Sequence, residues 1–282
     1  MTTHDRPTGL PGGIERAWGR RPLPRKGPKP GLDLGTILAA AVALAQAEGL
    51  GGVSMSRVAA ALGVSTMALY GYVDAKDELL ALMVDHACGT PPERVTEEGW
   101  RGGLEQWAST LFDSYRRHPW AVRIPISGVP PTPNQVAWLE AGLQCLGVTD
   151  LDEQQRLSTV LLLSVFVRSE ASLAVDLAEA RQVPAANADR SADYGQMIRE
   201  LIDPHRFPAV WAAASTGAFD DDAGVEGEFR FGLERILDGI EVLLHSHDAG
   251  TRGDASLREN PNVSGGRQRQ RFSRDFKAKP QH

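Results

Sequence analysis

The feature that most constrains this chain is a helical spacing of apolar residues that continues, helix after helix, from about residue 33 to 248. Phe229, Leu233 and Ile236 illustrate the recurrence at intervals of four and three. No stretch of five or more residues alternates apolar and polar side chains between hairpin turns, so we assign no sheet. Aromatic residues make up only 6% of the chain, and abundant alanine favours helices. We predict an all-α protein.

Positive charge is concentrated at the two ends of an otherwise acidic chain. The protein carries a net charge of −6, yet residues 1–31 and 251–282 are both strongly basic. Frequent Pro and Gly predict a disordered basic arm over 1–31, and missing periodicity predicts a disordered basic tail over 249–282. Either basic end can instead be a solvated segment that contacts no phosphate. We assign phosphate contact to the arm, because it directly precedes the first helix, and leave the role of the tail open.

Several classes of protein lack support in the sequence. Cys88 and Cys145 are the only cysteines, too few for a disulfide framework, and a reducing cytoplasm fits them. We find no signal peptide, and no apolar run reaches the roughly 18 residues of a membrane span. His245 and His247 are spaced two apart and point to different helix faces. With no catalytic or nucleotide-binding motif either, we expect a cytoplasmic protein that is not an enzyme and has no membrane, metal or cofactor partner.

Two short helices joined by a tight turn are expected within the first hundred residues. Ser54 and Ser65 suit the N-caps of helices over 55–61 and 66–72, and Gly63 between the helices tolerates a positive φ. Neither helix contains an acidic residue, as a surface that approaches the phosphates of DNA requires. The pattern is typical of a helix-turn-helix, although another small three-helix core can share it.

Domain organisation follows from the helical pattern. We expect a three-helix helix-turn-helix domain over 32–78 and a larger helical ligand-binding and dimerisation domain over 79–248. Long helices near 152–180 and 227–246 carry apolar side chains on more than one side. They therefore predict a homodimer that buries these helices against a second copy, with a monomeric core as the alternative.

A resemblance to a known family rests on SMSRVAAALGVSTMALYGYVDAKDELL, which follows the pattern L-Y-x-(H/Y)-V-x-x-K-(D/E)-x-L. This stretch resembles the DNA-binding domain of the tetracycline-repressor (TetR) family. PISGVPPTPNQVAWLEAGL and FRFGLERILDGIE are similar to the family's tetracycline-repressor-like C-terminal domain. The resemblance spans about 34–246. It implies a transcriptional repressor that binds a double-stranded DNA operator and is released by a small-molecule effector. Activation, or ligand binding without regulation, are the alternatives.

The resemblance also implies which residues contact DNA. Thr66, Met67 and Tyr70 correspond to base-reading positions, although the Tyr70 ring can instead close the helical core. The complete expected set is Ser54, Ser56, Ser65, Thr66, Met67, Tyr70, Tyr72 and Lys76. In the arm, the cations expected along the minor groove are Arg20, Arg21, Arg25, Lys26 and Lys29.

An effector pocket is expected among the helices of the second domain. Its candidate lining residues, each of which can instead be ordinary core, are Trp107, Leu111, Trp120, Ile124, Trp138, Phe166 and Arg168. Where the tetracycline repressor holds magnesium-bound drug through polar side chains, this chain has Pro92, Trp107 and, approximately, Ile124. We therefore expect a more apolar or aromatic effector than a tetracycline–magnesium complex.

Overall fold

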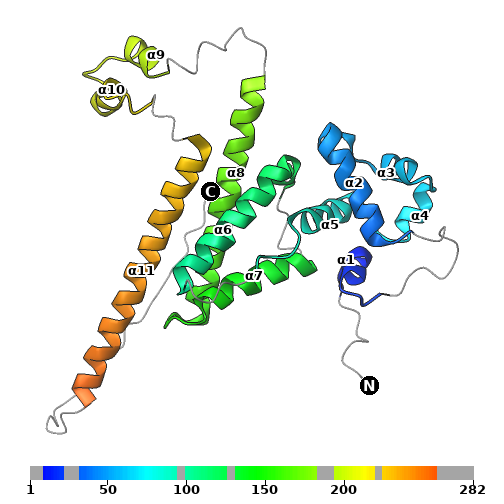
Figure 1. Cartoon of the computed structure of the whole chain (residues 1–282), viewed down its shortest axis with the longest axis horizontal. Helices are drawn as coiled ribbons and strands as arrows, with labels where there is room; N and C mark the ends of the chain where they lie inside the picture. The colour runs from blue at the N-terminus through cyan, green and yellow to red at the C-terminus, as the bar shows by residue number, and fades with distance from the viewer. Residues whose placement is uncertain are drawn as a thin grey trace, which may run out of the picture.

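A computed structural model describes residues 9–21, 32–93, 99–125, 131–182, 194–219 and 224–258 of the chain. These residues form helices and connecting turns without a strand, which confirms the all-α prediction (Figure 1). The α-helices are α1 (Gly12–Ala17), α2 (Leu34–Glu48), α3 (Met55–Leu62), α4 (Thr66–Tyr70), α5 (Lys76–Cys88), α6 (Gly99–Arg117), α7 (Pro133–Leu146), α8 (Glu153–Gln182), α9 (Tyr194–Leu201), α10 (Pro208–Ser215) and α11 (Gly224–Arg258). Two short 3-10 helices are η1 (Leu50–Gly52) and η3 (Pro119–Arg123).

Helix α2 begins and ends where its flanking residues dictate. The Asp33 carboxylate accepts a hydrogen bond from the backbone N–H of Thr36 over 2.7 Å and so caps the first turn. At the other end Gly49 adopts a φ of 70°, which stops the helix at low steric cost. The helix buries Ile37 and Ala41 completely, and this face supports the rest of the N-terminal domain.

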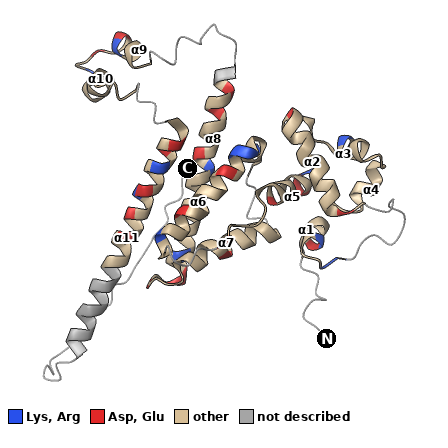
Figure 2. Cartoon of the chain, in the orientation of Figure 1, with Lys and Arg blue, Asp and Glu red and all other residues tan. Residues whose placement is uncertain are grey.

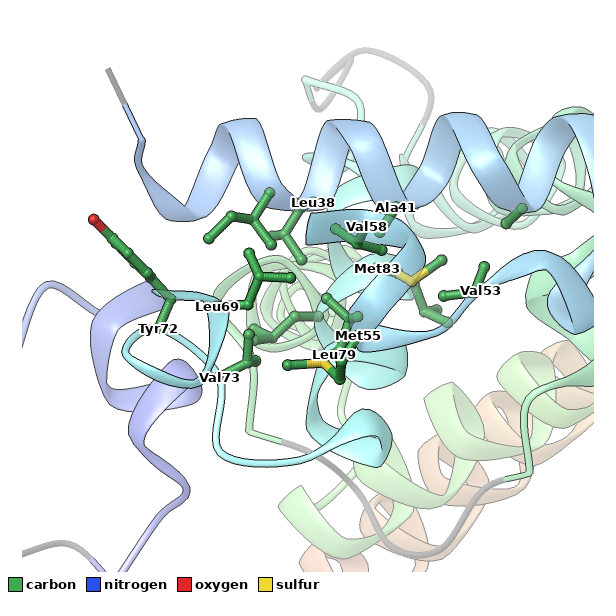
Figure 3. Packing of buried hydrophobic residues seen from close by; sticks show 14 of the residues in the cluster. Leu38, Ala41, Val53, Met55, Val58, Leu69, Tyr72, Val73, Leu79 and Met83 are labelled. Carbon is green, nitrogen blue, oxygen red and sulfur yellow. The ribbon is translucent and has the colours of Figure 1, made fainter. Parts of the chain in front are cut away.

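Helices α1 to α5 form an N-terminal unit, here called the head, around one apolar core. Figure 3 shows α2 lying over side chains contributed by α3, by α5 and by the turn after α4. The buried residues include Ile37, Leu38, Ala41, Val58, Leu69, Val73, Leu79, Leu82 and Met83. Trp120 of η3 and Ile124 directly after it also belong to this core, although η3 follows α6 in the sequence. The head therefore depends on a segment contributed from beyond its own chain limits.

Helices α6, α7, α8 and α11 build a second core in the C-terminal domain, residues 99–258. Aromatic stacking joins three of these helices: the Phe112 ring of α6 stacks on Phe229 of α11 with centroids 4.1 Å apart, and Phe166 of α8 stacks on the same ring at 5.7 Å. Helices α9 and α10 pack against each other, and in Figure 1 they stand apart from the other helices of the domain.

Several polar contacts connect the head to the C-terminal domain, and two of them involve buried or partly buried side chains. On one side, Gln46 at the end of α2 accepts a hydrogen bond from the Trp120 indole and donates one to the carbonyl of Arg117. On the other side, the buried Asp85 carboxylate of α5 accepts the backbone N–H of Gln135, 2.9 Å away in the first turn of α7. A carboxylate at a helix N-terminus also interacts favourably with the helix dipole.

The described helices and the expected domain limits differ at three places. Residues 1–31 are not disordered throughout, because Gly12–Ala17 forms α1 and Ile14 is buried in the head core. Helix α11 continues to Arg258, past the expected domain limit at 248; residues 259–282 lie outside the described part. The boundary at residue 78 falls inside α5, whose Leu82 and Met83 complete the head core.

None of the described helices combines the length and the apolar character needed to cross a membrane.

We expect Asp85→Ala to lower the free energy of unfolding by about 1.5–3 kcal/mol, because it removes a charged acceptor and leaves the Gln135 N–H without its partner. Urea titration measures this loss. Asp85→Asn keeps an acceptor oxygen and should lose less, while Asp113→Ala on the exposed side of α6 should change the value by less than about 0.5 kcal/mol. An Asp85→Ala effect as small as that of Asp113→Ala would contradict the assignment.

Candidate DNA-binding surface and C-terminal domain

Helix α3 and the turn after it have the expected geometry. Ser54 Oγ accepts the backbone N–H of Arg57 over 3.3 Å and caps α3, and the Ser54 and Ser56 hydroxyls lie 3.1 Å apart. Gly63 ends the helix in the left-handed region with φ 64° and ψ 35°, a conformation that side chains with a Cβ adopt at a steric cost. Ser54 is partly exposed and Ser56 is exposed, so both hydroxyls lie near the surface.

The second helix of the motif, α4, is only five residues long. Ser65 caps it by accepting the N–H of Ala68 over 3.2 Å, and Leu69 anchors it in the head core with no exposed surface (Figure 3). Met67 and Tyr70 project outward with 77% and 45% of their surface exposed. Helix α4 therefore has a buried apolar side and an exposed side without charge.

Tyr72 is the one member of the predicted DNA-contacting set that the structure removes from the surface. Only 1% of its surface is exposed, and its hydroxyl donates a hydrogen bond to the carbonyl of Leu32 over 2.8 Å. Figure 3 shows its ring pointing away from Leu69, toward the outer edge of the head. The hydroxyl expected to contact phosphate is therefore engaged inside the protein, where it connects the turn after α4 to the segment that leads into α2.

Charge around the motif is sparse. No charged residue lies on α4, which appears tan in Figure 2. Lys76 is exposed at the first position of α5, where its ammonium can act together with the free N–H groups of the helix start. Arg57 is already paired, since its guanidinium makes two hydrogen bonds to the Glu48 carboxylate at 2.8 and 2.5 Å. That pairing holds the pKa of Glu48 below its usual value.

The basic arm is described only in part. Arg20 and Arg21 are exposed, and Arg21 lies 3.9 Å from the Asp74 carboxylate. The other three expected minor-groove cations, Arg25, Lys26 and Lys29, lie outside the described residues.

The structure distributes the predicted effector residues between the two apolar cores. Trp107, Leu111 and Trp138 are buried in the C-terminal core, and Phe166 packs against it. Two others are buried in the head core instead: Trp120 and Ile124. A shallow, open depression of about 460 Å³ on the surface of α6 is lined by Thr110, Asp113, Arg116 and Arg117, none of them in the predicted set.

Two tryptophans of the predicted pocket connect segments of the protein through hydrogen bonds of their indole N–H groups. The Trp107 indole donates to the carbonyl of Trp138 over 2.9 Å, and the Trp138 indole donates to the carbonyl of Gly89 over the same distance. The two rings meet edge to face with centroids 5.6 Å apart. Both polar N–H groups are thus occupied inside the protein, which favours the ordinary-core interpretation of these residues.

Arg168 also has a connecting role. Its guanidinium donates to the carbonyls of Val122 and Ile124 at 2.8 and 2.5 Å, and it lies over the Tyr115 ring with a 5.9 Å separation. This side chain joins α8 to η3 at the border of the two cores. Cys88 packs against both cores at this border, and burial raises the pKa of its thiol to about 12.

Two buried carboxylates, Glu78 and Asp85, were not among the predicted site residues. Both lie on the core-facing side of α5 with Leu82, at spacings of four and three residues. Burying a carboxylate without a hydrogen-bond partner costs free energy. The spacing of Glu78 and Asp85 on the apolar side of α5 therefore indicates that another segment supplies hydrogen-bond donors there.

The helix-turn-helix head and the separate helical domain together define a class of DNA-binding regulators with an all-α effector domain. Comparison with protein-family models agrees: residues 37–83 match the bacterial regulatory proteins of the tetR family, and residues 92–244 match the tetracyclin repressor-like C-terminal domain. The chain belongs to the tetR family, whose members are transcriptional regulators. The resemblance inferred from the sequence is confirmed.

Curated and solved relatives support this assignment. The chain is 36% identical over 234 residues to the HTH-type transcriptional repressor DrrR1 of Streptomyces coeruleorubidus, covering 82% of this chain and 85% of that protein. It is 29% identical over 120 residues to the Escherichia coli tetracycline repressor protein class E, covering 41% and 56%. The crystal structure of the TetR family protein ActR of Streptomyces coelicolor with actinorhodin is similar with a TM-score of 0.63, 26% identity and coverage of 75% and 97%.

The raised pKa of Cys88 predicts an unreactive thiol. With Cys145 replaced by Ser, we expect a disulfide reagent at pH 8 to modify Cys88 about 1000-fold more slowly in the folded protein than after unfolding, because only the thiolate reacts. The folded state keeps the Cys88 proton between pH 9 and 12 while the unfolded state loses it, so stability should fall as pH rises above 9. Folded and unfolded rates within tenfold of each other would contradict this prediction.

Proposed function

We propose that the protein is a homodimeric repressor that binds an operator through its two heads and is released by a small-molecule effector. The observation that carries this proposal is the exposed, charge-free side of α4, held on a rigid core next to an exposed lysine. A dimer would present two such helices to successive major grooves, about 34–36 Å apart. The DNA-contacting unit would be the head, and the C-terminal domain would supply dimerisation and effector binding.

Base reading is assigned to the exposed side of α4. Thr66 has a hydroxyl that can bond a base edge, and Met67 offers an apolar contact for a thymine methyl. Tyr70, 45% exposed, can reach either a base or a phosphate oxygen. With no charged group on α4, sequence discrimination would rest on hydrogen bonds and apolar contacts.

Phosphate contact is assigned to the residues on either side of that helix. The exposed Ser56 hydroxyl, with Ser54 beside it at the start of α3, faces one backbone, and Ser65 can contribute at the start of α4. Lys76 offers a cation at the start of α5. These contacts position the head on DNA without reading sequence.

Dimerisation is assigned to α8 and α11. Exposed apolar side chains recur along α8 at multiples of four residues, at Leu161, Val165, Leu173 and Leu177. On α11, Phe231 and Val242 stand eleven residues, or about three turns, apart and are also largely exposed. Apolar stripes of this length on two neighbouring helices require a partner, and a second copy supplies an identical pair.

The effector is proposed to bind in the C-terminal domain. DrrR1 supports the repressor assignment, and ActR, which binds actinorhodin, supports a small-molecule effector. A tetracycline–magnesium complex is disfavoured because Trp107 uses its N–H internally and Ile124 is buried in the head core. We further propose that the regulator works in the cytoplasm and does not turn over its effector.

A footprint on the DNA upstream of its own gene, at two salt concentrations, tests DNA binding. We expect protection of a two-fold symmetric site that weakens with salt. Tyr70→Ala should weaken operator binding about tenfold through loss of one base or phosphate contact. Tyr194→Ala is the matched control, because Tyr194 has the same 45% exposure on α9 and should leave binding unchanged. No protected site there or in DNA selected from random sequence would refute the proposal.

Dimerisation is tested by Val165→Glu on α8. Placing an unpaired carboxylate in the proposed interface should weaken association about 100-fold, because the charge loses its hydration. Val148→Glu is the control: both valines are 67% exposed in the single chain, but Val148 lies in the turn after α7. Sedimentation should report a monomer for the first variant and a dimer for the second. Equal masses would argue against the α8 interface.

A further inference from the structure

Helix α1 is an addition to the head that lies outside the residues matching the family's DNA-binding model, 37–83. It has six residues, too few to persist as a helix without packing. Ile14 is buried in the head core, and Figure 1 places α1 beside α5. The tertiary contacts that stabilise α1 therefore connect it to the head at specific positions.

Two carboxylates of the head bind the N-terminus of α1. Asp74 Oδ2 accepts the backbone N–H of Gly12 over 2.8 Å. Glu78 Oε1 accepts the N–H groups of Gly13 and Ile14 over 2.6 and 3.1 Å. Because free N–H groups at a helix start need acceptors, these two acids satisfy the start of α1 from outside the helix.

The same Glu78 side chain also holds the turn that follows α4. Its second oxygen accepts the backbone N–H of Asp74 over 2.5 Å. Close approach of α1 depends on Gly13, since a Cβ there would lie only 2.9 Å from Glu78 Oε1 and 3.0 Å from Leu82 Cδ1. One buried carboxylate thus joins α1 to the turn between α4 and α5.

Arg16 makes the second link from α1 to this turn. Its Nη1 donates to the carbonyl of Tyr72 over 2.7 Å, and its guanidinium lies over the Tyr72 ring, 5.7 Å from the centroid. Tyr72 is two residues after the end of α4. Beyond α1, the Trp18 indole donates to the carbonyl of Pro131 over 2.5 Å, just before α7. The segment is therefore bonded to both domains.

We propose that α1 is a positioning element for the recognition helix: Arg16 and Glu78 hold the Tyr72–Asp74 turn and thereby fix the orientation of α4 against DNA. Helix α4 has five residues and a single fully buried side chain, Leu69, so its orientation depends on the segments that lead into and out of it. The incoming segment is fixed by Gly63 and the cap on α4. The outgoing segment is held by α1 through Arg16 and Glu78, in addition to the hydrogen bond from Tyr72 to Leu32, and Arg16 acts without contact with DNA.

This inference rests on the proposed DNA-binding function, and Arg16→Met in the full-length chain tests it. Methionine keeps an aliphatic stem and removes both the hydrogen bond and the charge. We expect operator affinity to fall about tenfold, while the slope of log affinity against log salt stays unchanged. A cation that touched phosphate would instead lower that slope by about 0.9. A lowered slope would therefore overturn the positioning role in favour of direct contact.

Two further variants separate the hydrogen bond from the charge. Arg16→Lys retains the cation and one possible donor, so it should recover part of the lost affinity. Arg206→Met removes the same charge outside the head, from an exposed residue just before α10. This variant should not show the tenfold loss of operator affinity with an unchanged slope of log affinity against log salt. If it does, the effect belongs to net charge and the proposal fails.

Hydrogen exchange of the full-length protein gives a readout that does not need DNA. In Arg16→Met we expect faster exchange over residues 68–75, with α7 unchanged. Unchanged exchange over 68–75 would overturn the proposal even if affinity fell. A wild-type protein that binds no DNA would refute the proposed function itself, whereas a wild type that binds normally beside an Arg16→Met variant of equal affinity would refute only the role of α1.

Discussion

Burial of Leu69 and Val73 is the constraint on which the head depends. A five-residue helix cannot persist in water on its own, so α4 exists only because these side chains lie beneath α2 with no exposed surface. Other contacts in the head stabilise this position of α4. Gly63 turns the chain toward α4, Ser65 caps it, and the Tyr72 hydroxyl bonded to Leu32 fixes its exit. Polar residues of α4 can face outward because Leu69 on the helix and Val73 after it are buried in the core.

The head and the C-terminal domain are connected by residues that each contributes to the packing of the other, and not by a linker alone. Helix α5 contributes Leu82 to the head core and the Asp85 carboxylate to the start of α7, while η3 crosses the other way and places Trp120 in the head core. A shift of α7 or η3 on effector binding would reach the head through these contacts. Such coupling is worth 1–3 kcal/mol in typical allosteric proteins.

Much of the fold could be predicted from the sequence because its helices carry local signals. Asp33, Ser54 and Gly63 mark helix limits through their own backbone chemistry, and the structure places helix ends at or beside each of them. Helix α1 was missed because its stability comes from Glu78 and Asp74, more than sixty residues away in sequence. Local composition alone, rich in Pro and Gly, favoured an extended arm there.

The candidate site was predictable to the extent that its residues lie on regular helices. The outward orientation of Met67 and Tyr70 follows from helical spacing, given Leu69 in the core. Tyr72 comes just after the helix, where a turn sets side-chain direction, and its burial required knowledge of where the chain enters α2. The positions of Trp120 and Ile124 also depend on tertiary structure, since η3 follows the first helix of the C-terminal domain but both residues pack in the head core.

Arg168 connects the proposed dimer helix to the head. From α8 it bonds the carbonyls of Val122 and Ile124, and the Ile124 side chain is buried in the head core. In a dimer built on α8, each head would stand at a fixed offset from the two-fold axis. The dimer would then fix the distance between the two recognition helices. That distance would match one spacing of half-sites along the helical repeat of DNA, and half-sites whose spacing differs by a few base pairs would be rejected.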